Sequence, residues 1–359
     1  MHIGEVITIE ATELVAGGDA LARVDGFPIF VSSVFPGDVA RVRLYEVKKG
    51  FAKAELVDIV TPSSWRRAAP CPVAGECGGC DWTALRLDKQ LEAKRRILLE
   101  SLRRIGKFDP ASLPETRIHP SPLNYRLRSR LHRDGDAVGF YAMRSNRVVP
   151  LARECEVVGV QTAHAPEEGE QWELAHEIVR DEGELTITVD AFTYRLHTRA
   201  FFQVNRHLLG TMLRLVTAHA SGKTALDLYA GVGFFTVPLA RHFDRVIAVE
   251  GSAVSAHYAR LNVPPNVNVI EAPVERQIAR LDPTDFVFLD PPRAGARREV
   301  IDAIAERTRE RIVYLSCDPV TFARDAHRMS GAGWQLTSLD LIDLFPNTHH
   351  VETLGAFVC

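Results

Sequence analysis

The chain has 359 residues, of which 46% are hydrophobic and 25% charged, and its net charge is −3 at neutral pH. These proportions are ordinary for a globular protein, and the length suits two or three domains. No apolar stretch is as long as a membrane span, and the N-terminus MHIGEVITIE lacks the basic and apolar regions of a secretory signal. We therefore expect a cytoplasmic protein that does not bind membranes and whose cysteines are metal ligands or catalysts rather than disulfide partners.

The basic residues are clustered even though the net charge is negative. Eight arginines and only two aspartates lie between Arg117 and Arg153, and a second basic segment runs from Phe35 to Lys53. Such clusters suit nucleic-acid phosphates, although a solvated basic face explains either one equally well. Three arginines alternate in sequence and would share one face of a strand, which suits phosphate contacts: Arg126, Arg128 and Arg130.

Residues 1–60 are expected to form the first domain. Short β-branched runs alternate there with Gly-Gly, Asp-Gly and Pro-Gly breaks, a pattern typical of a compact OB-like β-barrel. The segment VSSVFPGDVARVRL, with the basic residues after it, resembles the TRAM domain of RNA-modifying enzymes. The segment TPSSW, at 61–65, is interpreted as the linker to the next domain.

A cysteine cluster follows the linker. Cys71, Cys77 and Cys80 have the spacing C-x5-C-x2-C, and the glycines between them let the backbone curl so that three sulfur atoms converge. Cys155 is the most suitable donor of a fourth thiol. Four thiolates can hold either a structural zinc ion or an iron–sulfur cluster, and the residue types do not distinguish the two.

Residues 61–200 are expected to form a small central α+β domain that carries this cluster and binds RNA. Apolar and basic residues separate onto two sides of a helix predicted over 85–108, which we expect to pack on the catalytic domain. Short strands are predicted from Pro120 to Cys155, a helix over 169–183 and a hairpin over 184–198.

Residues 201–359 have the alternating strand–helix pattern of a Rossmann-like domain. A turn containing Tyr229 and Gly231 lets the backbone approach a ligand, and Glu250 ends the next strand, placed to bind a ribose. Two further strands end at Asp290 and at Cys317. A lone G-x-G is usually an ordinary turn and a lone cysteine is usually buried and inert, but the three strand ends together predict a ligand site.

Six motifs in this order resemble the S-adenosylmethionine-dependent RNA 5-methyluridine methyltransferases, which include tRNA and 23S rRNA uracil-C5 enzymes. The motifs are FFQVN (201–205), DLYAGVG (227–233), VIAVE (246–250), FLDPPRAG (288–295), LSCDPVTFARD (315–325) and DLFPNTHHVET (343–353). The resemblance implies an α/β protein with a C-terminal class I methyltransferase domain, an N-terminal TRAM barrel and a central iron–sulfur domain.

The resemblance also implies roles for individual residues. Cys317 matches the catalytic nucleophile and Glu352 the general base. The positions that match contacts to S-adenosylmethionine are Gln203, Tyr229, Gly231, Glu250 and Asp290. Those that match ligands of a [4Fe–4S] cluster, and so favour it over zinc, are Cys71, Cys77, Cys80 and Cys155. Phe234 stands where many members carry asparagine, so one polar contact with the cofactor is expected to be lost or replaced.

These residue types suit methylation of uracil. C5 of uracil is a weak nucleophile, and addition of a thiolate to C6 makes C5 enolate-like and able to accept a methyl group. A carboxylate must then remove the C5 proton so that the cysteine can leave. Glu352 can do so only if its strand, in HHVETLGAFV, returns beside the strand that ends at Cys317. The target base must also leave its stack to enter such a pocket.

The barrel and the cysteine set together favour 23S rRNA as the substrate, because the tRNA enzymes considered in this resemblance lack both. The enzyme is expected to be a monomer. A tRNA uridine-C5 methyltransferase is the main alternative. An exocyclic-amine methyltransferase is less well supported, since Arg293 rather than an aromatic residue follows Pro292. A non-catalytic RNA-binding or iron–sulfur sensor protein would bind RNA without binding the methyl donor.

Overall fold

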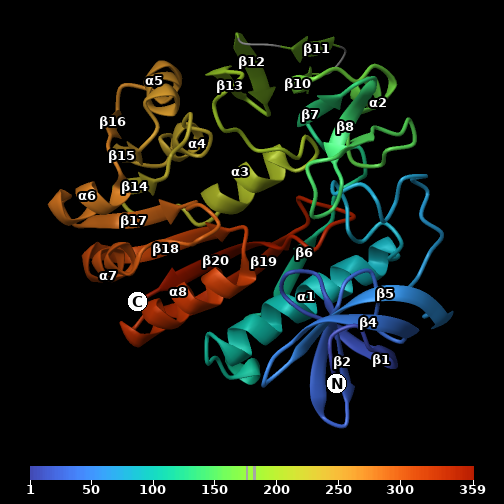
Figure 1. The fold of residues 1–359 in the computed structure, drawn as a ribbon. Coiled ribbons are helices and arrows are strands. Elements are labelled where there is room, and N and C mark those ends of the chain that lie inside the picture. Colours follow the sequence, from blue (N-terminus) through green and yellow to red (C-terminus); the bar gives the residue numbers. More distant parts are fainter. Residues whose placement is uncertain (175–176, 181–182) are drawn as a thin grey trace. The chain divides into compact units, whose positions relative to one another are not determined.

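A computed structural model describes residues 1–174, 177–180 and 183–359, which divide into two units. The barrel unit comprises Met1–Ile97, Arg130–Glu168 and Phe345–His350. The sheet unit comprises Leu98–Ser129, Gly169–Leu344 and Val351–Cys359. Figure 1 shows the elements of both units, coloured along the chain. The division into domains at residues 60 and 200 stays a prediction.

The N-terminal part of the barrel unit is a closed five-stranded barrel, as predicted. The strands follow one another around it in the order β1 (Val6–Leu14), β2 (Ala20–Val24), β3 (Phe27–Val31), β5 (Ala52–Thr61) and β4 (Val39–Val47). Alternate side chains, such as those of Val42 and Leu44, fill the interior. Asp25 and Gly26 have φ angles of 51° and 80°, so a two-residue turn with positive φ joins β2 to β3.

The helix predicted over 85–108 is present as α1 (Leu87–Arg104), and its residues up to Ile97 belong to the barrel unit. The short strands predicted after it are also present. They are β7 (Arg128–Asp134), β8 (Ala137–Tyr141) and β9 (Val148–Pro150), which pair in an antiparallel manner and precede α2 (Val160–His164). How α1 packs against a catalytic domain stays a prediction.

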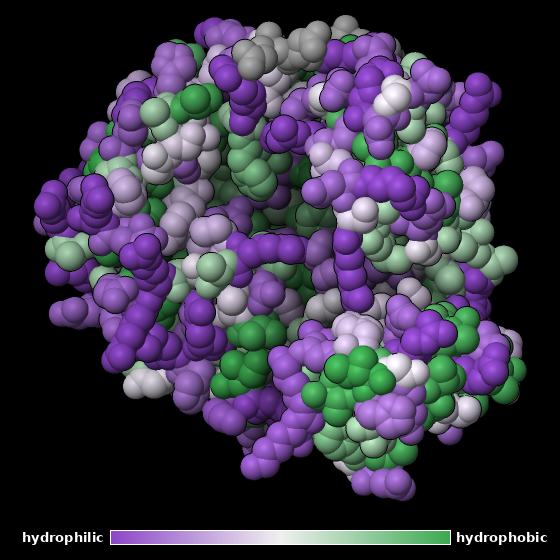
Figure 2. Space-filling model, viewed as in Figure 1, coloured by the Kyte–Doolittle hydropathy of each residue, from purple (hydrophilic) through white to green (hydrophobic). Residues whose placement is uncertain are grey.

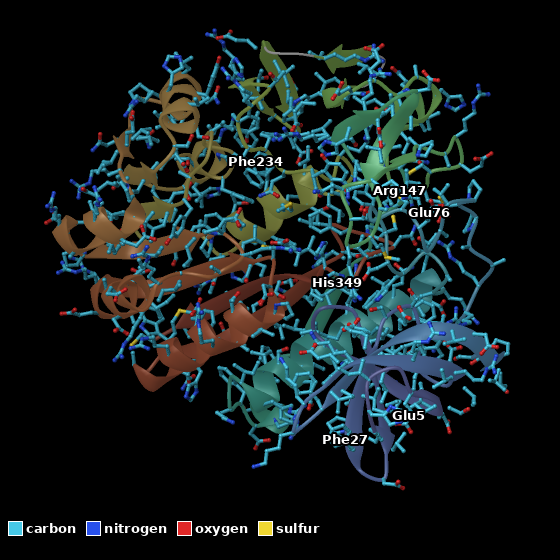
Figure 3. The ribbon with its side chains drawn as sticks, viewed as in Figure 1. Glu5, Phe27, Glu76, Arg147, Phe234 and His349 are labelled. Atoms are coloured by element: carbon cyan, nitrogen blue, oxygen red, sulfur yellow. The ribbon has the colours of Figure 1, made fainter. Side chains whose placement is uncertain are left out.

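A segment close to the C-terminus completes the barrel unit. Asn347 is fully buried with a φ of 65°, and its side-chain oxygen accepts hydrogen bonds from Arg67 and Gln90, both of 3.0 Å. Its amide nitrogen donates to Glu156 at 3.0 Å. His349, labelled in Figure 3, pairs with Asp81 at 2.7 Å. Buried hydrogen bonds therefore hold Phe345–His350 in this unit.

The helix predicted over 169–183 was wrong. The described residues form two antiparallel strands, β10 (Gly169–Leu174) and β11 (Glu177–Arg180), and residues 175–176 and 181–182 lie outside the description. Apolar residues at helical spacing suggested the helix, but Trp172 is fully buried and its indole N–H donates to the Thr198 carbonyl at 3.2 Å. Tertiary packing thus outweighed the local pattern. The hairpin predicted next is present as β12 (Glu184–Val189) and β13 (Phe192–His197).

An eight-stranded sheet forms the centre of the sheet unit. β20 runs antiparallel to both of its neighbours, and the other strand pairs are parallel. The strand order is β16 (Val267–Glu271), β15 (Arg245–Glu250), β14 (Thr224–Leu228), β17 (Thr284–Leu289), β18 (Thr308–Ser316), β20 (Glu352–Val358), β19 (Gln335–Ile342) and β6 (Thr116–His119). This is the predicted α/β class I methyltransferase fold.

Helices connect these strands (Figure 1). They are α3 (Leu209–Thr217), α4 (Thr236–Leu239), α5 (Ala253–Asn262), α6 (Val274–Gln277), α7 (Arg298–Arg307) and α8 (Pro319–Gly331), with 3-10 turns at Pro110–Ser112 and Ile278–Arg280. The Asp318 carboxylate caps α8 by accepting from the backbone N–H groups of Val320 and Thr321 at 2.9 and 2.8 Å. Among the described residues, no helix is long and apolar enough to cross a membrane.

Candidate active site

The carboxyl ends of β14, β15, β17 and β18 lie at one edge of the sheet because these strands are parallel. They lead directly into Tyr229, Glu250, Asp290 and Cys317. β20 runs in the opposite direction, so Glu352 begins its strand at the same edge, and Thr353 pairs with Ser316. The strand of Glu352 therefore returns beside the strand that ends at Cys317, as a role for Glu352 as the general base requires.

The glycine turn after β14 is tied to Glu250. The backbone N–H groups of Gly231 and Ser252 each donate to one oxygen of the Glu250 carboxylate, both at 2.7 Å. Tyr229 and Gly231 have positive φ angles of 62° and 59°. A Cβ atom built on Gly231 would meet no atom within 4 Å, so the turn borders open space, as a ligand cradle requires.

Asp227, the first residue of DLYAGVG, is a site residue that the sequence did not single out. It is buried, Thr236 donates to one of its oxygens, and the other oxygen has no hydrogen-bond partner. Burial raises the pKa of Asp227 to about 7, and the nearby carboxylates of Asp290 and Glu250 add to this effect. An unpartnered carboxylate oxygen beside the turn suits a ligand with a positively charged donor group.

Asp290 is the second carboxylate with a raised pKa. Burial raises its pKa to about 7, although the side-chain amide of Gln203 donates to it at 3.0 Å and opposes the shift. The structure thus brings Gln203 and Asp290 together, as predicted for the cofactor contacts. S-Adenosylmethionine carries a sulfonium and an ammonium group, so acidic residues at this edge fit its charge.

Cys317 is half-buried at the end of β18. Burial raises the pKa of its thiol to about 12, the charges of Glu352 and Asp290 add to the rise, and Arg293 opposes it. Glu352 is only 4% exposed, and burial holds the pKa of its carboxyl well above the usual range, with Asp290 adding to the shift. Burial thus favours the protonated form of both groups.

Phe234 does not present a polar group where many relatives carry asparagine. Its buried ring packs against Phe202, Phe235 and Tyr194 at centroid distances of 5.0, 4.8 and 5.4 Å (Figure 3). The Tyr194 hydroxyl donates to the Phe234 carbonyl at 2.9 Å. Any polar contact with the cofactor here must therefore come from another residue.

The arginine stripe predicted from sequence includes one residue, Arg128, whose guanidinium is engaged within the protein. Leu127 and Ser129 are buried between the arginines, so the predicted alternation is present, but β7 begins only at Arg128. Arg128 is ion-paired with Glu170 at 2.7 Å, and its guanidinium lies 5.1 Å from the centre of the Trp172 ring. Arg128 therefore supports the packing of the sheet unit in this state.

The four cysteines predicted to act together line one cavity in the barrel unit: Cys71, Cys77, Cys80 and Cys155. Phe140 and Leu151 make its wall apolar, and burial raises the pKa of the Cys71 thiol. Nearby, Glu76 and Arg147 form an ion pair of 2.7 Å (Figure 3). In the part of the chain that the structure describes, no three His, Cys, Asp or Glu side chains lie close enough to hold a single metal ion.

Comparisons with known proteins agree with this geometry. Residues 154–358 match the family model described as tRNA (Uracil-5-)-methyltransferase, and residues 2–57 match the TRAM domain. An uncharacterized RNA methyltransferase of Corynebacterium efficiens is 33% identical and the match covers 99% of this chain and 95% of the relative. Another uncharacterized RNA methyltransferase, from Gloeobacter violaceus, is 30% identical, and the match covers 98% of this chain and 96% of the relative.

A crystal structure shows the same fold over nearly the whole chain. It is the tRNA (uracil-54, C5)-methyltransferase of Pyrococcus abyssi in complex with S-adenosyl-L-homocysteine, with a TM-score of 0.74 and 24% identity, and the match covers 98% of this chain and 99% of that one. This overlap includes the barrel, so the expectation that tRNA enzymes lack a barrel was wrong. The chain belongs to the tRNA (uracil-5-)-methyltransferase family, as an S-adenosylmethionine-dependent RNA methyltransferase with an N-terminal TRAM domain.

Proposed function

We propose that this enzyme methylates C5 of a uridine in 23S rRNA through a covalent bond between Cys317 and C6 of the base. The observation that carries the proposal is the pairing of β18 with β20, which brings a thiol and a carboxyl group to one edge of the sheet beside Asp290. A nucleophile next to a general base is the arrangement that this chemistry needs.

The steps assign one task to each side chain. The Cys317 thiolate adds to C6 of uracil, and the electron pair of the C5–C6 double bond moves to C5 and the adjoining carbonyl. S-Adenosylmethionine, when bound, would supply an electrophilic methyl group, whose bond to the sulfonium sulfur breaks as C5 bonds to the methyl carbon, leaving the electron pair on a neutral thioether. The ionised Glu352 carboxylate then takes the C5 proton, the C5–C6 double bond re-forms, and the C6–sulfur bond breaks to release the thiolate.

The raised pKa of Cys317 implies that its thiol is not an active nucleophile until the methyl donor has bound. A thiol with a pKa of about 12 is almost entirely protonated at neutral pH. Positive charge from a bound methyl donor favours the ionised form of the groups beside it, and so lowers the pKa of the Cys317 thiol and of the Glu352 carboxyl. Gln203, Tyr229, Gly231, Glu250 and Asp290 are the residues that would hold the positively charged methyl donor, and Asp227 joins them through its unpartnered oxygen.

The four cysteines are assigned to a [4Fe–4S] cluster rather than to zinc. Four sulfur atoms around one zinc ion, each at about 2.3 Å, lie roughly 3.8 Å from one another. A four-iron cluster binds each thiolate through a different iron atom and so accepts sulfur atoms that are further apart. The proposal is supported by the shared lining of one apolar cavity by all four cysteines. We also infer that the enzyme is a cytoplasmic monomer.

A tRNA substrate is the second candidate, and a specific observation favours it. The Pyrococcus protein, whose name assigns it to position 54 of tRNA, matches 98% of this chain in fold, so the domain layout does not separate the two substrates. The distinction therefore depends on the RNA itself.

The deciding experiment compares both RNAs. In a strain that lacks this protein, mass spectrometry should show 5-methyluridine missing from one position of 23S rRNA, and the purified protein should restore it. Loss from tRNA alone would replace the rRNA assignment. RNA containing 5-fluorouracil should become covalently attached to the wild-type protein, because fluorine at C5 cannot leave as a proton.

Two cysteine variants complete this test. Cys317→Ala should form no covalent complex, whereas Cys359→Ala, which removes an exposed cysteine, should form it normally. Methylation at the normal rate by Cys317→Ala would overturn the proposed mechanism. Methylation of an exocyclic amine instead of C5 would point to a different methyltransferase, and RNA binding without methyl transfer would point to a sensor protein.

A further inference from the structure

A cavity of about 450 Å3 lies in the sheet unit beside the loop that follows Asp290. Residues Ala294–Glu299 form one wall, and Arg324, Asp325 and Arg328 of α8 form the other. Figure 2 shows hydrophilic side chains gathered over α7 and α8, the two helices that contribute to it. The mechanism above uses none of the residues that line this cavity.

Arginine is the main side chain of this cavity. Four guanidinium groups line it, from Arg297, Arg298, Arg324 and Arg328. Arg298 and Arg328 both pair with Asp302, with contacts of 3.6 and 3.1 Å, so one carboxylate is shared between two positive charges. Arg297 is exposed and forms no ion pair within the part of the chain that the structure describes. Glu299 and Asp325 also line the cavity, so four positive charges face two negative ones there and Asp302 beside it adds a third, which leaves a net charge of +1.

Hydrogen bonds of Arg324 and Asp325 hold the two walls of the cavity together. Arg324 donates to the carbonyl oxygens of Ala294 and Ala296, both at 3.2 Å, and to the buried Asp325 at 2.8 Å. Asp325 also accepts from the Tyr314 hydroxyl at 2.8 Å and so is used internally. A Cβ atom on Gly295, whose φ is 74°, would come within 2.5 Å of Arg324, so only glycine lets the loop fold over this arginine.

The first turn of α7 lies at the same place and contains Glu299. Arg297 occupies the N-cap position, and no side chain caps the helix. The N–H groups that open a helix attract anions, and arginine can bind a phosphate through two parallel hydrogen bonds. Arginines on both walls of an open cavity, beside the N-terminal end of a helix, have the chemistry of a phosphate site rather than of a site for an apolar ligand.

We propose that this cavity binds a backbone phosphate of the substrate RNA close to the uridine that is methylated. The inference rests on the proposed function, because it takes the flipped uridine to be at Cys317. α8 begins two residues after Cys317, and Arg324 lies five residues further on, or about 7 Å along the helix axis. The cavity is thus close enough to the reacting base to hold a neighbouring nucleotide and fix its register.

The test is the salt dependence of RNA binding. The Kd of a substrate RNA fragment is measured over a range of KCl concentrations for wild type, for Arg297→Ala and for the double variant R297A/R298A. For single-stranded RNA, each lost phosphate contact should reduce the slope of log Kd against log salt by about 0.7, which raises Kd roughly fivefold at 0.1 M salt. Arg297→Lys should recover part of the affinity because it keeps the charge.

A matched control is Arg214→Ala, which removes another exposed arginine of the same unit, paired with Asp190 at 2.9 Å. It should bind RNA like wild type. S-Adenosylmethionine affinity and the methylation rate at saturating RNA should not change in any of these variants, while KM for RNA should rise in the cavity variants alone. Unchanged salt slopes and Kd values in the double variant would overturn the inference, as would inorganic phosphate that binds the cavity without competing with RNA.

The outcomes also separate this inference from the proposed function. RNA binding is measured without methyl transfer, so the salt slope can change even if the wild-type protein forms no 5-methyluridine. In that case the phosphate site stands and the assigned reaction fails. Normal methylation with unaltered RNA binding in the double variant would instead support the assigned reaction and refute the phosphate site.

Discussion

Replacement of Glu352 by glutamine tests the general base without disturbing the fold. The carboxyl group is buried, which raises its pKa and favours its neutral form, and glutamine is neutral and of nearly the same size. We therefore expect the free energy of unfolding at pH 7 to fall by no more than about 1 kcal/mol, because glutamine matches the form of the side chain that burial favours.

Catalysis should respond much more strongly than stability. Removal of a general base typically costs a factor of about 100 to 10,000, which equals roughly 3 to 5 kcal/mol in the barrier. Cys317 can still add to C6 and C5 can still be methylated, but the C5 proton cannot leave. The methylated RNA should therefore accumulate as a covalent complex with Glu352→Gln, even on ordinary RNA without fluorine.

The assay is denaturing gel electrophoresis of Glu352→Gln with labelled RNA and methyl donor, followed by mass spectrometry of the trapped peptide. Glu352→Asp should be intermediate in turnover, because it keeps a carboxylate but shortens the side chain. The double variant C317A/E352Q should trap nothing. Turnover of Glu352→Gln at the wild-type rate would refute the assignment of the base, and slow turnover with no complex would refute the order of the steps.

The remaining predictions concern stability and the cysteine cavity. Asp227→Asn should raise the free energy of unfolding at pH 8 but not at pH 4. The pKa of Asp227 is about 7 in the folded protein, which is above its value in the unfolded chain, so ionisation of this carboxyl group makes the native protein less stable as the pH rises from about 4 to 7. Urea unfolding at both pH values checks this, and calorimetry should show weaker binding of the methyl donor. Cys71→Ser should lose bound iron, measured by metal analysis and visible absorbance, while Cys359→Ser should keep it. Gly355→Ala should lower the free energy of unfolding by about 1 to 3 kcal/mol, since its new Cβ would come within 2.5 Å of Phe322, and an unchanged thermal midpoint would contradict this.

The strand-end residues could be predicted from the sequence alone. Hydrophobic runs that stop at Glu250, Asp290 and Cys317 define parallel strands, and parallel strands deliver the residues that follow them to one edge. Glu352 was different, because its position depends on β20 entering the sheet between β18 and β19 in the opposite direction. Only the resemblance to a known family pointed to that residue in advance.

Non-local packing explains what the sequence did not reveal. Asp227 looks like an ordinary strand residue, and its unpartnered oxygen becomes visible only when the strands on both sides are in place. The segment 169–183 has apolar residues at helical spacing, but its described residues form the strands Gly169–Leu174 and Glu177–Arg180, and Trp172 bonds to a residue more than twenty positions away. The arginine cavity joins two motifs that are about thirty residues apart in the chain.

The place of Asn347 in the barrel unit has a consequence for synthesis of the chain. Arg67, Gln90 and Glu156 each form a hydrogen bond with this one buried side chain, which follows them in the chain by 280, 257 and 191 residues. While the chain grows on the ribosome, these three polar groups lack this partner until residue 347 has been made. The barrel strands, which are made first, can thus pair early, but the unit around them reaches its final hydrogen bonding only after Asn347 has emerged.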